Sequence, residues 1–541
     1  MHLLSGFSTS MTYLRNNFAF VALFAVAALL TCPAMAQDGF ISDANASRAG
    51  LKVAWSTQVD ISSKAELVDW QLVVDEDRAT TYFIISYGKR KEVIAETDIS
   101  PFGVAYGIEN ARKAADLRKE VIEHSLRNDG KEDVKVEITS YTLPRSTLFA
   151  LGGSGQVISL DADTGATNWI QKVGDHRLPS VGLGASKTHI AVANGSGVYC
   201  LDFDTGRILW RGQCKNGVDS SPTCSEDKVY VPLVSGRLQA FPLDKLGVES
   251  FNLVAEGGSR VRPLVTEKHV VWTTEKGHMN VAPLGPRRTV EYRLKTGAPI
   301  VSQASVSGNR LFVGSLDGFV YSVNETTGIL DWEVSTGQGI MRAPIPFGDD
   351  VYVVSRANEL HKIDAAEGNY PDGWQMPIRG IKTIAGFGVD SLYCIDTKGQ
   401  LIGINRNSRS VTKRVDGASI DLVLPNGVTD RMFFATKGGF IQCVHETSSL
   451  RPRFLESDLA IAKPKEMMGP KDESAMGESN PFGDDGESME DKNPFGDDGG
   501  ESMEDKNPFG DDGGSGESNP FGDDDDDDED DDDDENPFGG G

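Results

Sequence analysis

The residues best suited to binding a partner form a short motif, Asn-Pro-Phe-Gly, which occurs five times from residue 480 onward. Asn-Pro favours a turn, because the Asn side chain can hydrogen-bond to the backbone that follows while proline fixes its own φ. Such a turn would hold each phenylalanine outward, and two aspartates follow the glycine in four copies. The candidate partner-binding residues are Asn480, Pro481, Phe482, Asp484, Asn493, Pro494, Phe495, Asp497, Asn507, Pro508, Phe509, Asp511, Asn519, Pro520, Phe521 and Asp523.

Two interpretations of these repeats are open. They resemble the N-P-F-x-D ligand motif recognised by small adaptor domains, and more loosely the N-P-F motif bound by EH domains. Copies spaced 13, 14, 12 and 17 residues apart would suit multivalent capture through a flexible chain. However, residues 486–499 and 500–513 are identical blocks, which tandem duplication produces without selection for binding. The second interpretation is therefore a tail that solvates the protein and attracts cations.

Charge sets this tail apart from the rest of the chain. Residues 471–541 hold 29 Asp plus Glu against three Lys, which is a net charge of −26 out of a total of −28. A segment with so few apolar residues cannot offset its ordering entropy, so residues 456–541 are predicted to be disordered. The run Asp523–Glu535 would attract divalent cations only weakly, because it lacks a fixed calcium-loop geometry. Neither part shows the basic face that nucleic-acid binding requires.

The first 36 residues indicate export. An apolar run over residues 18–30 is followed by small residues at Ala34 and Ala36, which is typical of a signal peptide cleaved after Ala36. The run is too short to cross a membrane as a helix, so no transmembrane span is expected in the mature form. A lipoprotein signal ending at Cys32 is the alternative, although Thr31 is bulky for it. The expected location is the periplasm or the outside of the cell, including its envelope.

Cleavage would leave five cysteines, an odd number for an exported protein. None has the CxxC spacing of a zinc site. Cys214 and Cys224 flank a Gly/Ser/Pro loop and could form a disulfide. The alternative is that the cysteines are buried and reduced, above all Cys200, Cys394 and Cys443.

The part of the chain that would position any functional site is built from a repeated sequence of about forty residues. Copies such as LFALGGSGQVISLDADTGATNW begin at residues 148, 190, 229, 270, 311, 351, 392 and 432, a spacing of about forty residues that indicates an array. Each copy has two strands joined by a glycine turn, then a polar turn and a strand that can hold Trp, and one more short strand precedes it. Four strands per repeat predict an all-β fold, an eight-bladed β-propeller of four-stranded blades over residues 137–455.

Tryptophans recur at one position of this repeat. Trp169, Trp210 and Trp332 occupy equivalent outer strands and are predicted to pack between blades. The last copy lacks such a strand, whereas residues 53–60 within the N-terminal segment 37–60 resemble it. Trp55 is therefore predicted to close the ring, with residues 449–455 as the competing segment.

Residues 61–136 do not follow the period. Alternating segments and a helical stretch over residues 108–126 predict a small α+β insertion lying on the propeller. Its helix is predicted to bury one apolar face, made of Ala111, Ala114, Ala115, Leu117, Val121, Ile122 and Leu126.

The D-x-x-T-G-x-x-x-W kernels of the three strong copies resemble the pyrroloquinoline-quinone-like (PQQ-like) propeller repeats over roughly residues 148–447. That family includes quinoprotein dehydrogenases, which bind the quinone and calcium, and binding scaffolds such as the propeller of the outer-membrane protein assembly machine. The dehydrogenases commonly have a vicinal cysteine pair, which this chain lacks. Asp317, Asp350 and Asp396 stand at strand–turn positions, where capping carboxylates are usual.

The resulting hypothesis is a non-enzymatic exported propeller that scaffolds proteins of the bacterial envelope and needs no cofactor. Its protein partners would bind a propeller face and the acidic tail. The alternative is a dehydrogenase dependent on PQQ and calcium whose active site has diverged.

Overall fold

The computed structural model describes residues 40–61, 65–101, 103–131, 133–243, 249–415, 420–449 and 451–455. The signal peptide expected over residues 1–36 and the tail expected over 456–541, with every Asn-Pro-Phe-Gly copy, lie outside the described residues. No helix among the described residues is long and apolar enough to cross a membrane.

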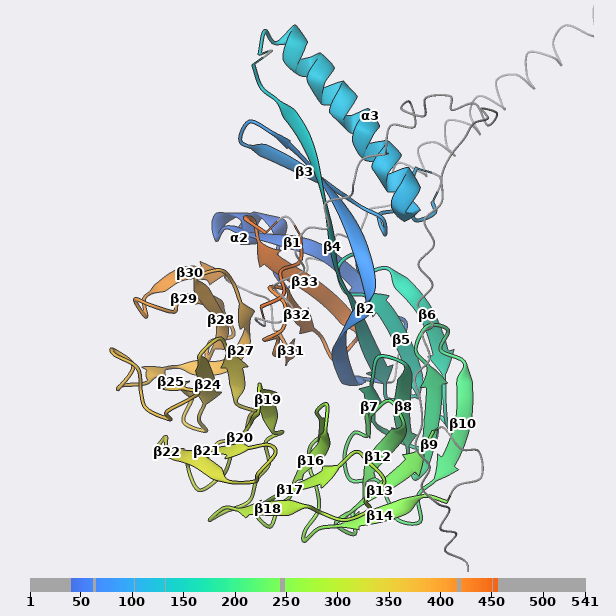
Figure 1. Cartoon of the computed structure of the whole chain (residues 1–541), viewed down its shortest axis with the longest axis vertical. Helices are drawn as coiled ribbons and strands as arrows, with labels where there is room; N and C mark the ends of the chain where they lie inside the picture. Colours follow the sequence, from blue (N-terminus) through green and yellow to red (C-terminus); the bar gives the residue numbers. More distant parts are fainter. Residues whose placement is uncertain are drawn as a thin grey trace, which may run out of the picture. The chain divides into compact units, whose positions relative to one another are not determined.

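The described strands form eight sheets, one for each copy of the repeat, which follow one another around a ring (Figure 1). Each sheet is an antiparallel meander, and its first strand lies nearest the centre of the ring. The expected eight-bladed propeller is confirmed. We number the blades I to VIII from residue 67 onward.

Blades I to IV contain these strands, from the inside outward. Blade I has β2 (Leu67–Tyr87), β4 (Val136–Gly152), β5 (Gln156–Asp161) and β6 (Thr167–Lys172), with β3 (Arg90–Ala95) beside β2. Blade II has β7 (Ser180–Ala185), β8 (His189–Asn194), β9 (Gly197–Asp202) and β10 (Ile208–Gln213). Blade III has β11 (Thr223–Cys224), β12 (Lys228–Pro232), β13 (Arg237–Pro242) and β14 (Phe251–Val254). Blade IV has β15 (Leu264–Val265), β16 (His269–Thr273), β17 (His278–Pro283) and β18 (Tyr292–Lys295).

Blades V to VIII repeat this order. Blade V has β19 (Ser305–Ser307), β20 (Arg310–Gly314), β21 (Phe319–Asn324) and β22 (Leu330–Ser335). Blade VI has β23 (Ile345–Phe347), β24 (Asp350–Val354), β25 (Glu359–Asp364) and β26 (Ile378–Arg379). Blade VII has β27 (Ile381–Phe387), β28 (Ser391–Asp396), β29 (Leu401–Asn405) and β30 (Val411–Val415). Blade VIII has β31 (Leu422–Leu424), β32 (Met432–Ala435), β33 (Phe440–Glu446) and β1 (Leu51–Gln58).

The meander fixes which loops share an end of the ring. Because strand direction alternates, the loops that join one blade to the next lie at the same end as the turns between second and third strands. We call this end the connection face. The Asp-x-x-Thr-Gly turns between third and fourth strands lie at the opposite end.

Blade VIII takes its outermost strand from the beginning of the described chain. Strand β1 pairs antiparallel with β33, with Trp55 opposite Cys443. Just before it, the short helix α2 (Asp43–Arg48) packs with Phe40 and Ile41 on the blade, and Gln442 both accepts from and donates to the Ile41 backbone at 3.1 and 3.0 Å. The competing segment lies elsewhere, since Phe454 forms a bridge with Thr429.

The tryptophans fasten each blade to the next. The indole N–H groups of Trp55, Trp169 and Trp332 donate to backbone carbonyls in the Asp-x-x-Thr-Gly-type turn of the following blade, over 2.9, 3.0 and 3.1 Å. Trp210 packs on Phe241 of blade III instead. These contacts place a large apolar ring at four of the eight junctions. Three of the four rings also satisfy their own donor, whereas Trp210 Nε1 has no hydrogen-bond partner among the described residues.

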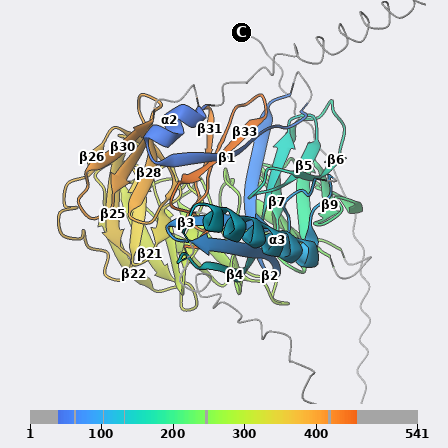
Figure 2. The same cartoon turned by 90° about the horizontal axis from the view of Figure 1, so that it is seen from above.

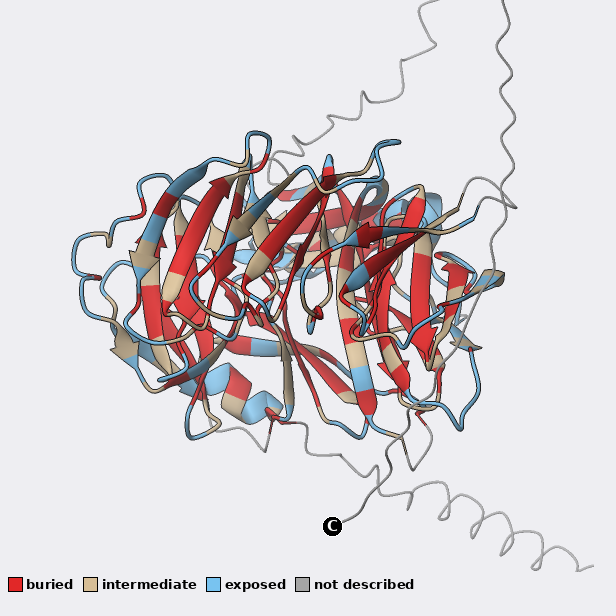
Figure 3. Cartoon of the chain, turned by 90° about the horizontal axis from the view of Figure 1, so that it is seen from below, coloured by how far each residue is buried: buried red, intermediate tan, exposed pale blue. Residues whose placement is uncertain are grey.

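Buried residues concentrate on the middle strands of the blades (Figure 3). The apolar clusters span neighbouring blades, as where Val73 and Phe149 of blade I pack with Leu183 and Ile190 of blade II. The fold is therefore stabilised by contacts between successive repeats.

An arm extends from blade I. Strands β2 and β4 pair over Leu67–Tyr87 and Val136–Gly152, so their first and last parts belong to the blade. Beyond a bulge in β2 between Asp75 and Ala79 they continue past the ring, where β3 joins β2. The boundaries 61–136 expected for an insertion are therefore wrong, because residues 67–75 are the innermost strand of blade I. Two strands that run through both parts make the arm continuous with the ring.

Helix α3 (Gly107–Asn128) covers one face of the arm (Figure 2). Ala111, Ala115 and Ile122 are buried against Phe83 and Ile85 of β2 and neighbouring residues. The single apolar face expected here is wrong in part, since Leu117 is 63% and Val121 is 50% exposed. At 100° per residue these two positions point away from the face shared by 111, 115 and 122.

We expect the Trp55 junction to depend on the glycine of the turn beneath it. Gly165 has a φ of +72°, and a Cβ there would lie 2.5 Å from the Trp55 ring. Gly165→Ala should cost roughly 1–2 kcal/mol for the left-handed backbone and a further 1–3 kcal/mol for the displaced ring. Gly308→Ala is the control, since Gly308 has a φ of +54° with nothing within 4 Å of the added Cβ. Urea unfolding of both variants measures the difference, and equal losses would contradict the junction's role.

Candidate functional site

The carboxylates considered as catalytic candidates all serve structural roles. Asp317 accepts from the backbone N–H of Phe319 and Gly297, both at 2.9 Å. Asp350 forms an ion pair of 2.7 Å with Lys362. Asp396 accepts from the N–H groups of residues 398 and 400 in its turn. Each carboxylate is therefore engaged in holding its own blade.

The innermost strands share an interaction that sequence reasoning missed. Asp69 on the innermost strand β2 accepts hydrogen bonds from the Leu183 N–H of blade II, the Ser221 hydroxyl before β11 and the Arg262 guanidinium before β15, at 2.9, 2.7 and 2.6 Å. Arg262 also donates to the Leu183 carbonyl. One carboxylate thus ties blades I to IV together. The sequence analysis did not single out Asp69, because it placed residues 61–136 in an insertion outside the blades.

The groups around Asp69 do not fit a quinone with calcium. Calcium needs six to eight oxygen ligands, and no group of three acidic, His or Cys side chains that could hold a metal ion lies within the described residues. Arg262, the cation beside Asp69, is already neutralised by that carboxylate.

The described cysteines are all free thiols and all buried. The disulfide between Cys214 and Cys224 is therefore wrong, and the buried reduced state holds for all five. Cys214 and Cys224 pack with Cys200 in the apolar cluster between blades II and III, where burial raises the pKa of the Cys200 thiol to about 12. They contribute to packing.

An exposed rim lies on the connection face of blades II to IV. Val234, in the turn between β12 and β13, is 62% exposed, and its backbone N–H donates to the Gly217 carbonyl at 2.9 Å. Beside it, Arg260 lies 3.5 Å from Asp219 and 3.3 Å from Glu275. Leu178, 46% exposed, continues the rim towards blade II. An apolar tip flanked by a charged triad is a surface that a protein partner can cover.

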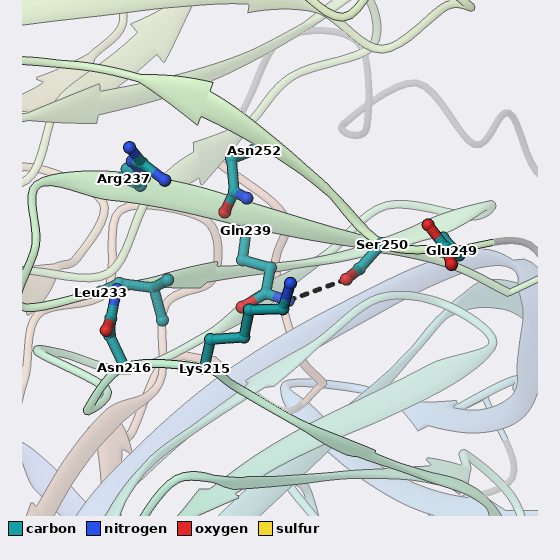
Figure 4. Close-up of a pocket in the computed structure, with 8 residues that line it drawn as sticks. All are labelled: Lys215, Asn216, Leu233, Arg237, Gln239, Glu249, Ser250 and Asn252. Carbon is teal, nitrogen blue, oxygen red and sulfur yellow. Dashed lines mark hydrogen bonds between the residues drawn. The ribbon is translucent and has the colours of Figure 1, made fainter. Parts of the chain in front are cut away.

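A pocket of about 350 Å³ adjoins this rim (Figure 4). It is formed by two strands of blade III and by the loop after β10. Its lining is polar except for one leucine: Lys215, Asn216, Leu233, Arg237, Gln239, Glu249, Ser250 and Asn252. Gln239 stands opposite Asn252 in the strand pairing and donates to the Ser250 hydroxyl at 2.8 Å.

Comparison with known proteins agrees with the blade geometry. The sequence profile of a family described as outer membrane protein assembly factor BamB matches residues 153–252 and 257–408. The chain is a PQQ-like propeller that resembles these assembly factors. The resemblance drawn from the D-x-x-T-G-x-x-x-W kernels is thereby confirmed.

Individual relatives match more weakly. The outer membrane protein assembly factor BamB of Burkholderia pseudomallei (strain K96243) is 30% identical over 94 residues, which is 17% of this chain and 24% of that protein. The match thus spans about a quarter of the curated relative. BamB from Moraxella catarrhalis has a TM-score of 0.46 at 15% identity, covering 55% of this chain and 91% of that one. The designed Ika8 protein has a TM-score of 0.45 at 14% identity, with coverages of 55% and 93%.

The matched ranges leave out the arm, whose root holds a buried charged cluster. Asp163 accepts from the Tyr82 hydroxyl at 2.7 Å, and Arg431 of blade VIII approaches Asp163 and Asp430 to 3.9 and 3.6 Å. Asp163 Oδ1 and the Nε and Nη1 atoms of Arg431 have no hydrogen-bond partner within the described chain. Burial raises the pKa of the Asp163 carboxyl to about 6, while Arg431 opposes the rise.

We expect Asp163 to make stability depend on pH. Because its folded pKa lies above the unfolded value of about 3.9, its contribution is complete below about pH 4 and is lost as pH rises through about 6. Asp163→Asn mimics the protonated form and should remove up to about 3 kcal/mol of this change. Urea midpoints from pH 4 to 7 measure it, with Asp133→Asn, an exposed position, as the control. A wild-type slope retained in Asp163→Asn would contradict the assignment.

Proposed function

We propose that this protein is an exported, non-enzymatic propeller scaffold that binds proteins of the cell envelope on its connection-face rim. The observation that carries the proposal is the pairing of exposed Val234 with the Arg260 triad on one rim. Protein interfaces favour this arrangement, in which an apolar anchor sits inside a polar surround. The relatives' description as outer membrane protein assembly factors supports it.

The location in the envelope follows from the same proposal. The predicted signal peptide over residues 1–36 would export the chain, and assembly of outer membrane proteins takes place beyond the inner membrane. A scaffold of this kind needs no cofactor.

The acidic tail has a part in this proposal as a second binding element. Five phenylalanines in otherwise polar, acidic sequence would give a multivalent ligand whose copies bind one partner in succession. Replacing all five by Ala in the full chain should remove that partner from a crosslinked envelope sample, whereas rim partners should stay. Identical partner sets for both proteins would leave only the solvating interpretation.

We expect a single charge on the rim to remove its partners. Val234→Asp places a carboxylate at the apolar tip beside Asp219, and truncation of an interface anchor typically costs at least 2 kcal/mol of binding energy, or about thirty-fold in affinity. The matched control is Ile329→Asp, because Ile329 is 64% exposed but lies in a turn at the opposite end of blade V. Crosslinking in cells followed by quantitative mass spectrometry compares the two.

Comparing the proteins lost by the two variants distinguishes binding at the rim from binding elsewhere on the surface. Proteins lost with Val234→Asp and kept with Ile329→Asp are rim partners, provided that both variants unfold at the wild-type temperature. If the two variants lose the same proteins, or neither loses any, the rim is not the docking surface.

A further inference from the structure

The strands of blade III bring three pocket side chains to one face of the sheet. Side chains two residues apart on a β-strand lie on the same face, so Arg237 and Gln239 of β13 share one. Asn252 of β14 stands directly opposite Gln239 in the strand pairing and lies on that face too. All three residues line the pocket. The strand pairing therefore fixes where these side chains start relative to one another.

The loop after β10 supplies another part of the wall and is held at both ends. Lys215 lines the pocket from this loop. Just before it, the Cys214 N–H donates to the Ser196 carbonyl at 2.9 Å. Just after it, the Gly217 carbonyl accepts from the Val234 N–H at 2.9 Å. The backbone that carries Lys215 is therefore tied to blades II and III.

The pocket has charges without partners. Lys215 and Arg237 are both exposed, and the described part of the chain offers neither side chain an ion pair or hydrogen bond. Glu249 is the one acid of the lining, and its carboxylate also has no such partner among the described residues. The pocket therefore presents two positive charges and one negative charge.

One buried group in the pocket also lacks a partner. Gln239 is only 4% exposed, and its amide nitrogen donates to the Ser250 hydroxyl. Its Oε1 atom has no hydrogen-bond donor among the described residues. Figure 4 shows Gln239 in the middle of the lining residues. Because a buried acceptor without a donor is costly, the pocket favours a ligand that supplies an N–H group.

These features favour a ligand with two carboxylates and one ammonium group. The carboxylates would meet Lys215 and Arg237, and charge-assisted hydrogen bonds are about twice as strong as neutral ones. The ammonium group would meet Glu249 and donate a hydrogen bond to Gln239 Oε1. A phosphate or a simple dicarboxylate would also meet both cations, but Glu249 would repel it and it has no N–H group. An acidic amino acid carries all three groups.

We propose that the pocket of blade III binds a free acidic amino acid, aspartate or glutamate. Its two carboxylates contact Lys215 and Arg237, and its ammonium group lies between Glu249 and Gln239 Oε1. The pocket volume of about 350 Å³ lies in the range of small-molecule sites. The site does not depend on what docks on the rim, and it adds a small ligand to a scaffold whose proposed partners are proteins.

A ligand-detected NMR titration of the full chain with L-glutamate and L-aspartate tests the proposal. A ligand of about ten non-hydrogen atoms should have a dissociation constant of about 1 mM at ordinary ligand efficiency, which this method measures. Glutarate and succinate lack the ammonium group, whereas glutamine and asparagine have one carboxylate replaced by an amide. Each should bind about two- to five-fold more weakly than the matching acidic amino acid, the fold-change of one exposed ion pair.

Three variants assign the binding to the pocket. Arg237→Gln should weaken glutamate binding about two- to five-fold. Glu249→Gln should reduce the preference for glutamate over glutarate, because that preference comes from the ammonium group. Lys398→Gln, which removes an exposed lysine from blade VII, is the matched control and should change neither value. All three positions are exposed, so the variants should unfold at the wild-type temperature, which a thermal melt checks.

Three results would overturn the proposal. The first is no saturable binding of either amino acid up to about twenty times the expected dissociation constant. The second is equal affinity for glutamate and glutarate and for aspartate and succinate, which would make the ligand a simple diacid. The third is glutamate binding that Arg237→Gln leaves as strong as Lys398→Gln does, which would place the binding elsewhere on the chain.

Discussion

The structure depends on closing its ring with a strand from the other end of the chain. Strand β1 lies beside β33, so that the Ile41 backbone meets Gln442 across 401 residues of sequence. Bringing such distant segments together costs about 5 kcal/mol of chain entropy by the usual logarithmic scaling. The β1–β33 hydrogen bonds and the burial of Trp55 between blades VIII and I offset this cost. Without closure, β33 would be an open edge and blades I and VIII would each lose a packing partner.

The candidate surfaces lie on blades whose inner strands are joined to one another. Each blade is held only by its neighbours, so local rigidity depends on how well adjacent blades are joined. Asp69 joins the inner strands of blades I to IV through Leu183, Ser221 and Arg262. The rim and the pocket both lie on this group of blades, which therefore holds their side chains at fixed separations. Preorganised groups bind at a smaller entropic cost than mobile ones.

The sequence predicts what repeats and fails to predict what occurs once. The forty-residue period and the Trp positions are enough to derive eight blades, because every copy has to bury the same apolar positions against its neighbours. The boundary of the arm could not be predicted from the repeat, because one continuous strand, β2, belongs to both the blade and the arm. Only the pairing of β2 with β4 shows where the blade ends. Leu117 and Val121 look like core residues by composition, yet the angle of the helix turns them outward.

The candidate site was still less accessible to sequence reasoning. Val234 is an ordinary turn residue, and only its exposure marks it. Gln239 is an ordinary strand residue, and only its unsatisfied buried acceptor marks it. Both properties depend on the three-dimensional surroundings of the residue, which the repeat pattern does not determine. The same strand β2 that carries Asp69 carries Tyr82 at the arm root, 13 residues or about 43 Å further along a β-strand. The arm is therefore built on the strand that ties blades I to IV together.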